Sequence, residues 1–110
     1  MRVPVAFLLV LSIGCAAVDG HRHFEVGNAA LERGDAALAV AELERAAALV
    51  PQASEVQNHL GIAYTAAGRP DAALAAFERA VALDCDNRAA AENLRVARAR
   101  SATAPPLDAR

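Results

Sequence analysis

The sequence predicts an all-α fold in which antiparallel helical hairpins stack as a short α-solenoid. The main observation is a period of 34 positions, because residues 54–85 repeat the pattern of residues 20–51. Small residues recur at fixed places in both units, and a glycine interrupts each unit near its middle, at Gly34 and Gly68. Glycine at such a point is typical of the end of one helix before the next. A fixed period of this length indicates a helical-hairpin repeat.

Length and composition limit the classes of protein that fit. The chain has 110 residues, a formal net charge of −2 and 4% aromatic residues, so one small domain is expected. The charge is too small for a basic nucleic-acid-binding surface. We therefore expect no nucleic-acid partner.

Residues 1–17 are predicted to be a signal peptide. Arg2 precedes an apolar run over residues 3–13, which has the length of a secretory hydrophobic region. A membrane-spanning helix needs roughly 20 residues. The alternative is a buried N-terminal helix, but no helix start signal precedes the run and it carries no polar face. The chain is thus expected to be exported.

The stretch from Leu11 to Cys15 resembles a bacterial lipobox. This resemblance implies that Cys15 becomes the lipidated first residue of the mature protein and tethers it to a membrane. Acyl chains contribute about 0.8 kcal/mol per buried methylene, so two or more hold a small domain stably at a surface. The alternatives are ordinary cleavage after Ala16 or Ala17, which yields a periplasmic or secreted protein, and an uncleaved anchor.

Residues 18–23 are expected to form a linker, and residues 24–51 the first repeat unit. His21 and His23 lie two positions apart and so do not face each other on a helix, which argues against a metal site. Asp35 is suited to cap the second helix of this unit.

Residues 54–85 form the second predicted unit. Ser54 with Gln57 three residues later has the spacing of a capping box. Pro70 suits the first turn of the following helix, where its missing N–H would be unpaired anyway. The residues predicted to pack the helices of both units together are Gly27, Ala39, Ala46, Gly61, Tyr64, Ala73, Phe77 and Ala80.

Residues 86–100 are predicted to be a capping helix that begins at Asp86 and Asn87. Leu94 continues the register of the inner stripe, whereas Arg95 and Arg98 replace a glycine and a tyrosine. Charges at these packing positions predict an outer face that meets water, as the end of a repeat array requires. Residues 101–110 are predicted to be a disordered tail.

The two units resemble tetratricopeptide repeats over about residues 20–99. The family has small residues at the eighth, twentieth and twenty-seventh positions of a unit, which here are Gly27, Ala39, Ala46, Gly61, Ala73 and Ala80. Its bulky positions are filled in the second unit by Leu60, Tyr64 and Phe77. The chain departs from the family at the usual tryptophan position, which holds His23 and Gln57, and at Ala30 and Cys85, where tyrosine and proline are usual.

The resemblance implies a concave groove that binds a protein or peptide partner. The predicted groove residues, mapped by register onto the first helix of each unit, are Phe24, Asn28, Leu31, Glu55, Asn58, Ile62 and Thr65, and the cap adds Glu92 and Val96. Some members of the family clamp a C-terminal carboxylate. Only Asn28 matches that pattern here, so this ligand is not expected.

An enzyme is not expected from this sequence. It has no glycine-rich phosphate loop and no paired-cysteine metal motif. Cys85 lies between Asp84 and Asp86, whose negative charge disfavours a reactive thiolate. We expect Cys85 to be buried and inert, with an intermolecular disulfide as the alternative. The prediction is no catalytic residue, no metal site and no cofactor.

The function expected from these observations is a non-enzymatic adaptor or scaffold of the bacterial cell envelope. Because two units and a cap are few for a stable array, a small self-associating subunit of a larger envelope assembly is an alternative. A soluble secreted binder is another.

Overall fold

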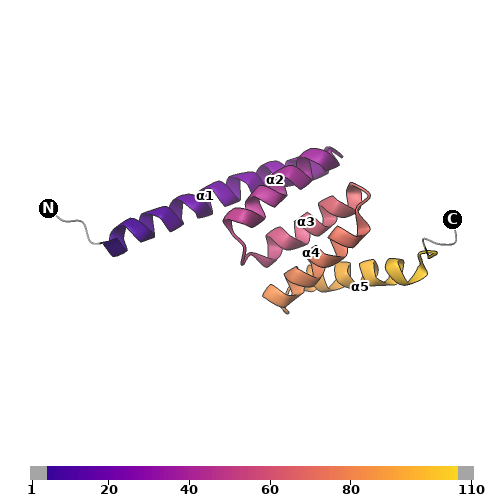
Figure 1. The fold of residues 1–110 in the computed structure, drawn as a ribbon. Helices are drawn as coiled ribbons and strands as arrows, with labels where there is room; N and C mark the ends of the chain where they lie inside the picture. The colour runs from indigo at the N-terminus through magenta and orange to yellow at the C-terminus, as the bar shows by residue number, and fades with distance from the viewer. Residues whose placement is uncertain (1–4, 107–110) are drawn as a thin grey trace.

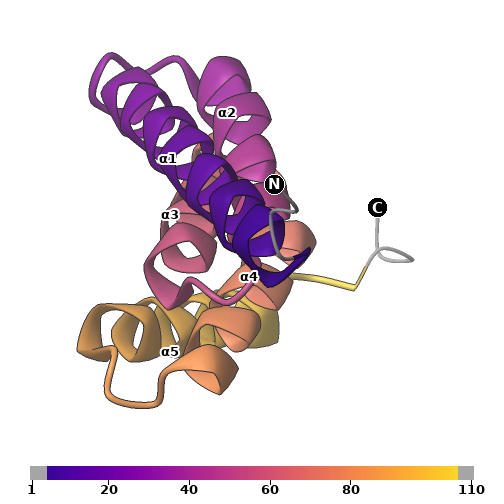
Figure 2. The same cartoon turned by 90° about the vertical axis from the view of Figure 1, so that its left-hand side faces the viewer.

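A computed structural model describes residues 5–106, with the backbone alone for residues 5–13. Its helices are α1 (Val5–Glu32), α2 (Ala36–Leu49), α3 (Ser54–Ala66), α4 (Pro70–Leu83) and α5 (Arg88–Thr103). The predicted all-α fold of stacked hairpins is confirmed. α1 packs on α2 and α3 packs on α4, while α2–α3 and α4–α5 contacts join successive layers. Figure 2 shows the α1–α2 hairpin at one end of the stack and α5 at the other.

The two hairpin turns have the same geometry. Gly34 and Gly68 adopt φ values of 77° and 71°, in the left-handed region that favours glycine. In the first turn the Gly34 N–H donates to the Leu31 carbonyl at 3.0 Å, and the Asp35 N–H donates to the Ala30 carbonyl at 2.9 Å. The second turn repeats both bonds at 3.1 and 2.8 Å. These are the bonds of a Schellman motif, and they end α1 and α3 identically.

Three predicted helix starts are confirmed. The Asp35 carboxylate accepts a hydrogen bond from the Leu38 N–H at 3.2 Å and caps α2. The Asn87 side chain accepts from the Ala90 N–H at 3.1 Å and caps α5. Pro70 occupies the first position of α4. Side-chain caps of this kind contribute about 1 kcal/mol each.

The predicted capping box at Ser54 is wrong. Ala53 is the N-cap residue of α3 and makes no side-chain cap bond. The Ser54 hydroxyl donates instead to the Ala80 carbonyl near the end of α4, at 2.8 Å, and accepts from the Asn87 amide at 2.9 Å. The Ala80 carbonyl already accepts from the Asp84 N–H at 3.1 Å, so Ser54 adds a second donor from a different helix.

Glycine allows the two helices of each hairpin to approach closely. A Cβ atom on Gly27 would lie 2.6 Å from Leu43 Cγ, and one on Gly61 would lie 2.6 Å from Phe77 Cδ1. Both separations are below any real Cβ contact. The two units therefore share one helix-packing contact, with leucine in the first and phenylalanine in the second.

The predicted linker over residues 18–23 is wrong, because these residues are part of α1. The helix continues because α2 offers it a packing surface. Gly20 lies against the Val50 side chain, and His23 Nδ1 lies 2.5 Å from Glu42 Oε2. The N-terminal part of α1 extends past the hairpin (Figure 1).

The last helix is longer than predicted, and the structure does not describe the terminal residues. α5 continues to Thr103, past the predicted boundary at residue 100. Of the rest of the predicted tail, residues 104–106 are not helical. Residues 107–110, like residues 1–4 of the predicted signal peptide, lie outside the described residues. Across the described part of the chain, we find no helix that combines the length and apolar character of a membrane span.

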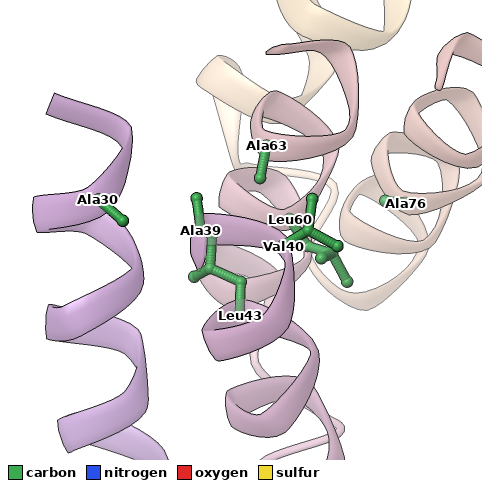
Figure 3. Close-up of a cluster of buried hydrophobic side chains, with 7 residues drawn as sticks. All are labelled: Ala30, Ala39, Val40, Leu43, Leu60, Ala63 and Ala76. Atoms are coloured by element: carbon green, nitrogen blue, oxygen red, sulfur yellow. The ribbon is translucent and has the colours of Figure 1, made fainter. Parts of the chain in front are cut away.

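The core consists of small and aliphatic side chains in two clusters. The larger cluster joins α1 to α4, as Figure 3 shows, and contains Ala30, Ala39, Val40, Leu43, Leu60, Ala63 and Ala76. The smaller cluster joins α4 to α5 through Ala73, Phe77 and Leu94. Leu60 and Leu94 are 6% and 7% exposed, so the register predicted for the capping helix is confirmed.

Candidate partner-binding groove

An open groove of about 740 Å³ lies between α3, α4 and α5. We call it the α3–α5 groove. Its apolar lining includes Ile62, Pro70, Phe77, Val96 and Ala97, and its polar lining includes Thr65, Asp71, Asn93, Arg100 and Ser101. The groove is thus mainly apolar, with a few polar groups that can orient a ligand.

The groove exists because α5 presents small side chains to its neighbours. Ala97, Ser101 and Ala104 all line it and follow the helical spacing of one face. Phe77, held against Gly61, forms a wall from α4. Small residues on one helix leave space that a packed side chain would otherwise fill.

Three of the predicted groove residues lie on this groove, Ile62, Thr65 and Val96. Ile62 is 36% exposed, which is high for a large apolar side chain in this chain. The Thr65 hydroxyl donates to the Gly61 carbonyl one turn earlier, at 2.9 Å. Its hydrogen is therefore engaged within the helix, and the oxygen remains able to accept a second bond.

Phe24 and Leu31 do not line the α3–α5 groove. Both pack against the larger core cluster. The Phe24 ring meets the His59 ring edge to face, with centroids 5.0 Å apart and an interplanar angle of 81°. These side chains instead hold α1 against α3.

The two predicted asparagines have different surroundings. Asn58 is 5% exposed, and its Oδ1 accepts a hydrogen bond from Asn93 Nδ2 at 2.9 Å. Because Asn93 lines the groove, this hydrogen bond to the buried Asn58 fixes the orientation of a side chain in the groove lining. Asn28 Oδ1 is buried without a hydrogen-bond partner.

Glu55 and Glu92, the remaining predicted residues, are exposed and do not line the groove. The Glu55 carbonyl pairs with His59 at 2.9 Å, and the Glu92 carboxylate pairs with Arg95 at 2.6 Å.

Asp71 and Arg100 give the groove charges of both signs. Asp71 lies in the first turn of α4, and Arg100 lies in the last turn of α5. Each also has the sign that stabilises its helix end. The sequence interpretation missed both, because it assigned the groove to the first helix of each unit. The small-residue spacing on α5 was the available signal.

A polar cluster joins the first hairpin to the second beside the groove. The Tyr64 hydroxyl donates to Glu44 Oε1 at 2.8 Å, and the Arg69 guanidinium lies 4.7 Å from the Tyr64 ring centroid. Partial burial of the phenol raises the pKa of Tyr64, and its hydrogen bond to Glu44 raises it further.

The expected burial of Cys85 is wrong. Its side chain is exposed, in the turn that follows Asp84, the C-cap residue of α4. Cys15, on α1, is also exposed. Nowhere among the described residues do three or more His, Cys, Asp or Glu side chains gather as metal ligands would.

Comparison with known families adds one finding. Residues 54–87 match the family model of the tetratricopeptide repeat. The match spans α3, α4 and the turn into α5, which are the elements around Gly61, Phe77 and the α3–α5 groove. No curated protein matches the chain.

Proposed function

We propose that this tetratricopeptide repeat protein is a non-enzymatic adaptor that binds a peptide or short helix of a partner protein in the α3–α5 groove. Tetratricopeptide repeats are modules for protein–protein interaction and are typically non-catalytic. The site proposed for that interaction is the α3–α5 groove, which combines open space with an apolar lining.

The size and lining of the groove carry the proposal. A volume of about 740 Å³ is within the range of sites that hold small ligands, and it suits a few side chains of a peptide. Ile62, Phe77 and Val96 offer apolar contacts to such side chains. The Asn93 amide offers a hydrogen-bonding group for a peptide backbone, as amides both donate and accept.

Site-specific photo-crosslinking tests this proposal. A photoreactive amino acid replaces Thr65 in the groove, or Ala75 on an exposed face of α4 as a matched control, in the full chain within its native host. We expect a discrete adduct from position 65 that is absent from position 75. Ile62→Glu, placed in the same chain, should abolish that adduct because a carboxylate in the apolar lining opposes binding. Identical adducts from both positions, or an adduct unaffected by Ile62→Glu, would contradict groove binding.

We further propose that the adaptor is exported and tethered to a membrane of the bacterial envelope through lipidated Cys15. The lipobox-like sequence supports this, and so does the exposure of Cys15. Gly20 packs on Val50, so the packed α1–α2 hairpin would begin a few residues after such an anchor. The other outcome is a periplasmic or secreted binder without an anchor.

The intact mass of the mature protein distinguishes these outcomes. A chain that begins at Cys15 and carries acyl groups, recovered from membranes, supports the tether. Cys15→Ser should then block maturation and retain the precursor. A chain that begins near Ala17 or Val18, recovered from the soluble fraction, would overturn the tether and leave groove binding as a separate question.

A further inference from the structure

One face of α1 lacks the cover that the same face has on α3 and α5. On α3, this face consists of Val56, Leu60 and Ala63, which are all buried where α3 packs on the preceding hairpin. On α5 it includes Ala90 and Leu94, which are also buried. In each case the preceding hairpin covers the face.

Thirty-four positions earlier, the same face of α1 carries Arg22, Val26 and Ala29. We call this surface, extended along the helix to Asp19 and Arg33, the outer face of α1. Val26 is 41% exposed, although its counterparts on α3 and α5 are 6% and 7% exposed. Val18, one turn from Arg22, is 69% exposed. The outer face therefore presents apolar side chains at positions that are otherwise buried.

Two of the three charges on this face, Asp19 and Arg33, lie symmetrically about Val26, whereas the position related to Arg22 is the uncharged Ala30. Asp19 precedes Val26 by seven residues, and Arg33 follows it by seven, which is about two helical turns in each direction. Both charged side chains are exposed. If two such helices pair antiparallel about a twofold axis at Val26, Asp19 of each copy meets Arg33 of the other. A parallel pair would place like charges together.

From this symmetry we infer that the outer face of α1 pairs antiparallel with the same face of a second copy of this chain. Such a contact is isologous, so each favourable charge pair occurs twice. The apolar contact between the two Val26 side chains lies between the charge pairs. This surface is separate from the α3–α5 groove, so it leaves the groove open in both copies.

A head-to-tail contact with α5 fits less well. The open side of α5 carries Arg95, whose guanidinium already pairs with Glu92 at 2.6 and 2.9 Å. These long charged side chains stand where Gly27 and Gly61 allow close helix approach in the two hairpins. A second copy of the outer face of α1 instead brings the smaller apolar side chains of Val26 and Ala29 to the centre of the contact.

Sedimentation of the purified full chain over a range of concentrations tests this inference. Reducing conditions are kept because the exposed Cys15 and Cys85 could form disulfides. The wild-type mass should rise from one chain to two as concentration increases. Val26→Glu should raise the dissociation constant at least about tenfold. The matched control is Ile62→Glu, which places the same charge at a similarly exposed site in the groove and should leave self-association unchanged.

A charge exchange then tests the orientation of the pair. Asp19→Arg and Arg33→Asp should each weaken self-association, and the double variant should restore it. Circular dichroism confirms that every variant remains helical. The inference is overturned if the wild type stays monomeric, if Ile62→Glu acts as strongly as Val26→Glu, or if the double charge variant is weaker than both single variants.

Discussion

The two interfaces between successive layers, which we call joints, are formed by the same repeat positions but by side chains of different chemistry. In the first joint, where α3 packs on the first hairpin, Phe24 and His59 meet as an aromatic pair. In the second joint, where α5 packs on the second hairpin, the residues 34 positions later are Asn58 and Asn93, which share a hydrogen bond. An apolar contact in one joint is thus a polar contact in the other.

A second pair of positions shows the same change. Tyr64 donates to Glu44 in the first joint, and Arg98 lies 3.8 Å from Glu78 in the second. The predicted exposure of Arg98 to water is confirmed, since its side chain is 63% exposed, and its guanidinium also reaches back to α4. Both partners of that pair are more than half exposed, so the ion pair contributes little stability.

Side-chain size at corresponding positions determines which of the two joints contains a groove. Leu31 packs against the core in the first joint, whereas Thr65, its counterpart, lines the groove in the second. A shorter polar residue at this position, together with the small Ala97 and Ser101 side chains of α5, leaves the α3–α5 groove unfilled. The groove thus depends on two or three side chains, while the backbone pattern is common to both joints.

The largest expected effect comes from filling the close contact inside the second hairpin. Gly61→Leu forces a side chain into the Phe77 ring and should lower the free energy of unfolding by about 3 kcal/mol. Gly27→Leu should cost less, because the flexible Leu43 side chain can move aside more easily than a ring. Thermal unfolding measures both, and Ala75→Leu on an exposed helix face is the control. Equal stability of Gly61→Leu and wild type would contradict the packing described.

The next effect distinguishes the two asparagines. Asn58→Ala leaves the Asn93 amide without its partner and should lower the free energy of unfolding by about 2 kcal/mol. Asn28→Ala should be nearly neutral, because its Oδ1 already lacks a hydrogen bond. Urea unfolding of both variants measures the difference. A larger loss for Asn28→Ala would mean that the buried oxygen has a partner in solution.

A smaller effect is expected when residues of the second joint are replaced by the residues found 34 positions earlier, in the first joint. Thr65→Leu should fill the groove, and Arg98→Tyr, which lies outside the groove lining, gives Glu78 the phenol that Glu44 has in the first joint. Together they should raise the free energy of unfolding by about 1 kcal/mol through added apolar burial. The same double variant should lose the crosslink expected for groove binding. Thr65→Ser, which keeps the groove open, is the matched control. A double variant that is less stable than wild type would show that backbone position, rather than side-chain size, keeps the joint open.

The smallest effect is a titration of the polar cluster in the first joint. Tyr64 is the single tyrosine of the chain, so ultraviolet absorbance follows its ionisation alone. Burial, with help from Glu44, should place the Tyr64 pKa above its ordinary value of 10.0. The stability that this contributes is fully present below the pKa of the unfolded chain and is lost as pH rises through the folded pKa.

A pair of matched variants tests the cause of that pKa shift. Glu44→Gln removes the negative charge beside the phenol and should lower the Tyr64 pKa. Glu78→Gln makes the same change in the second joint and should leave it unaltered. An equal response to both variants would show that the shift arises from the overall charge of the protein.

Features within one unit could be predicted from the sequence, because local chemistry determines them. The turn at Gly68 and the start of α4 at Pro70 follow from backbone preferences. The close contact of Gly61 with Phe77 follows from the period. Each of these features involves residues a short distance apart in the chain.

Features that depend on a neighbouring element could not be predicted in the same way. Ser54 does not cap α3, because its hydroxyl donates to the Ala80 carbonyl near the end of α4. Residues 18–23 became helical because α2 gave them a surface to pack on. Cys85 is exposed because the turn after α4 directs it to solvent. In the groove, Ile62, Thr65 and Val96 were anticipated, but Arg100 depends on how α5 crosses α4.

Arg95 also limits how this architecture could grow by tandem duplication. A copy of α4 attached after α5 would need a glycine at position 95, since Gly27 and Gly61 each admit the second helix of their hairpin at that register. The arginine there is held by Glu92 on its own helix. The volume of this one side chain thus opposes close packing of a further helix on α5, and Arg95→Gly is the first change that an engineered third hairpin would require.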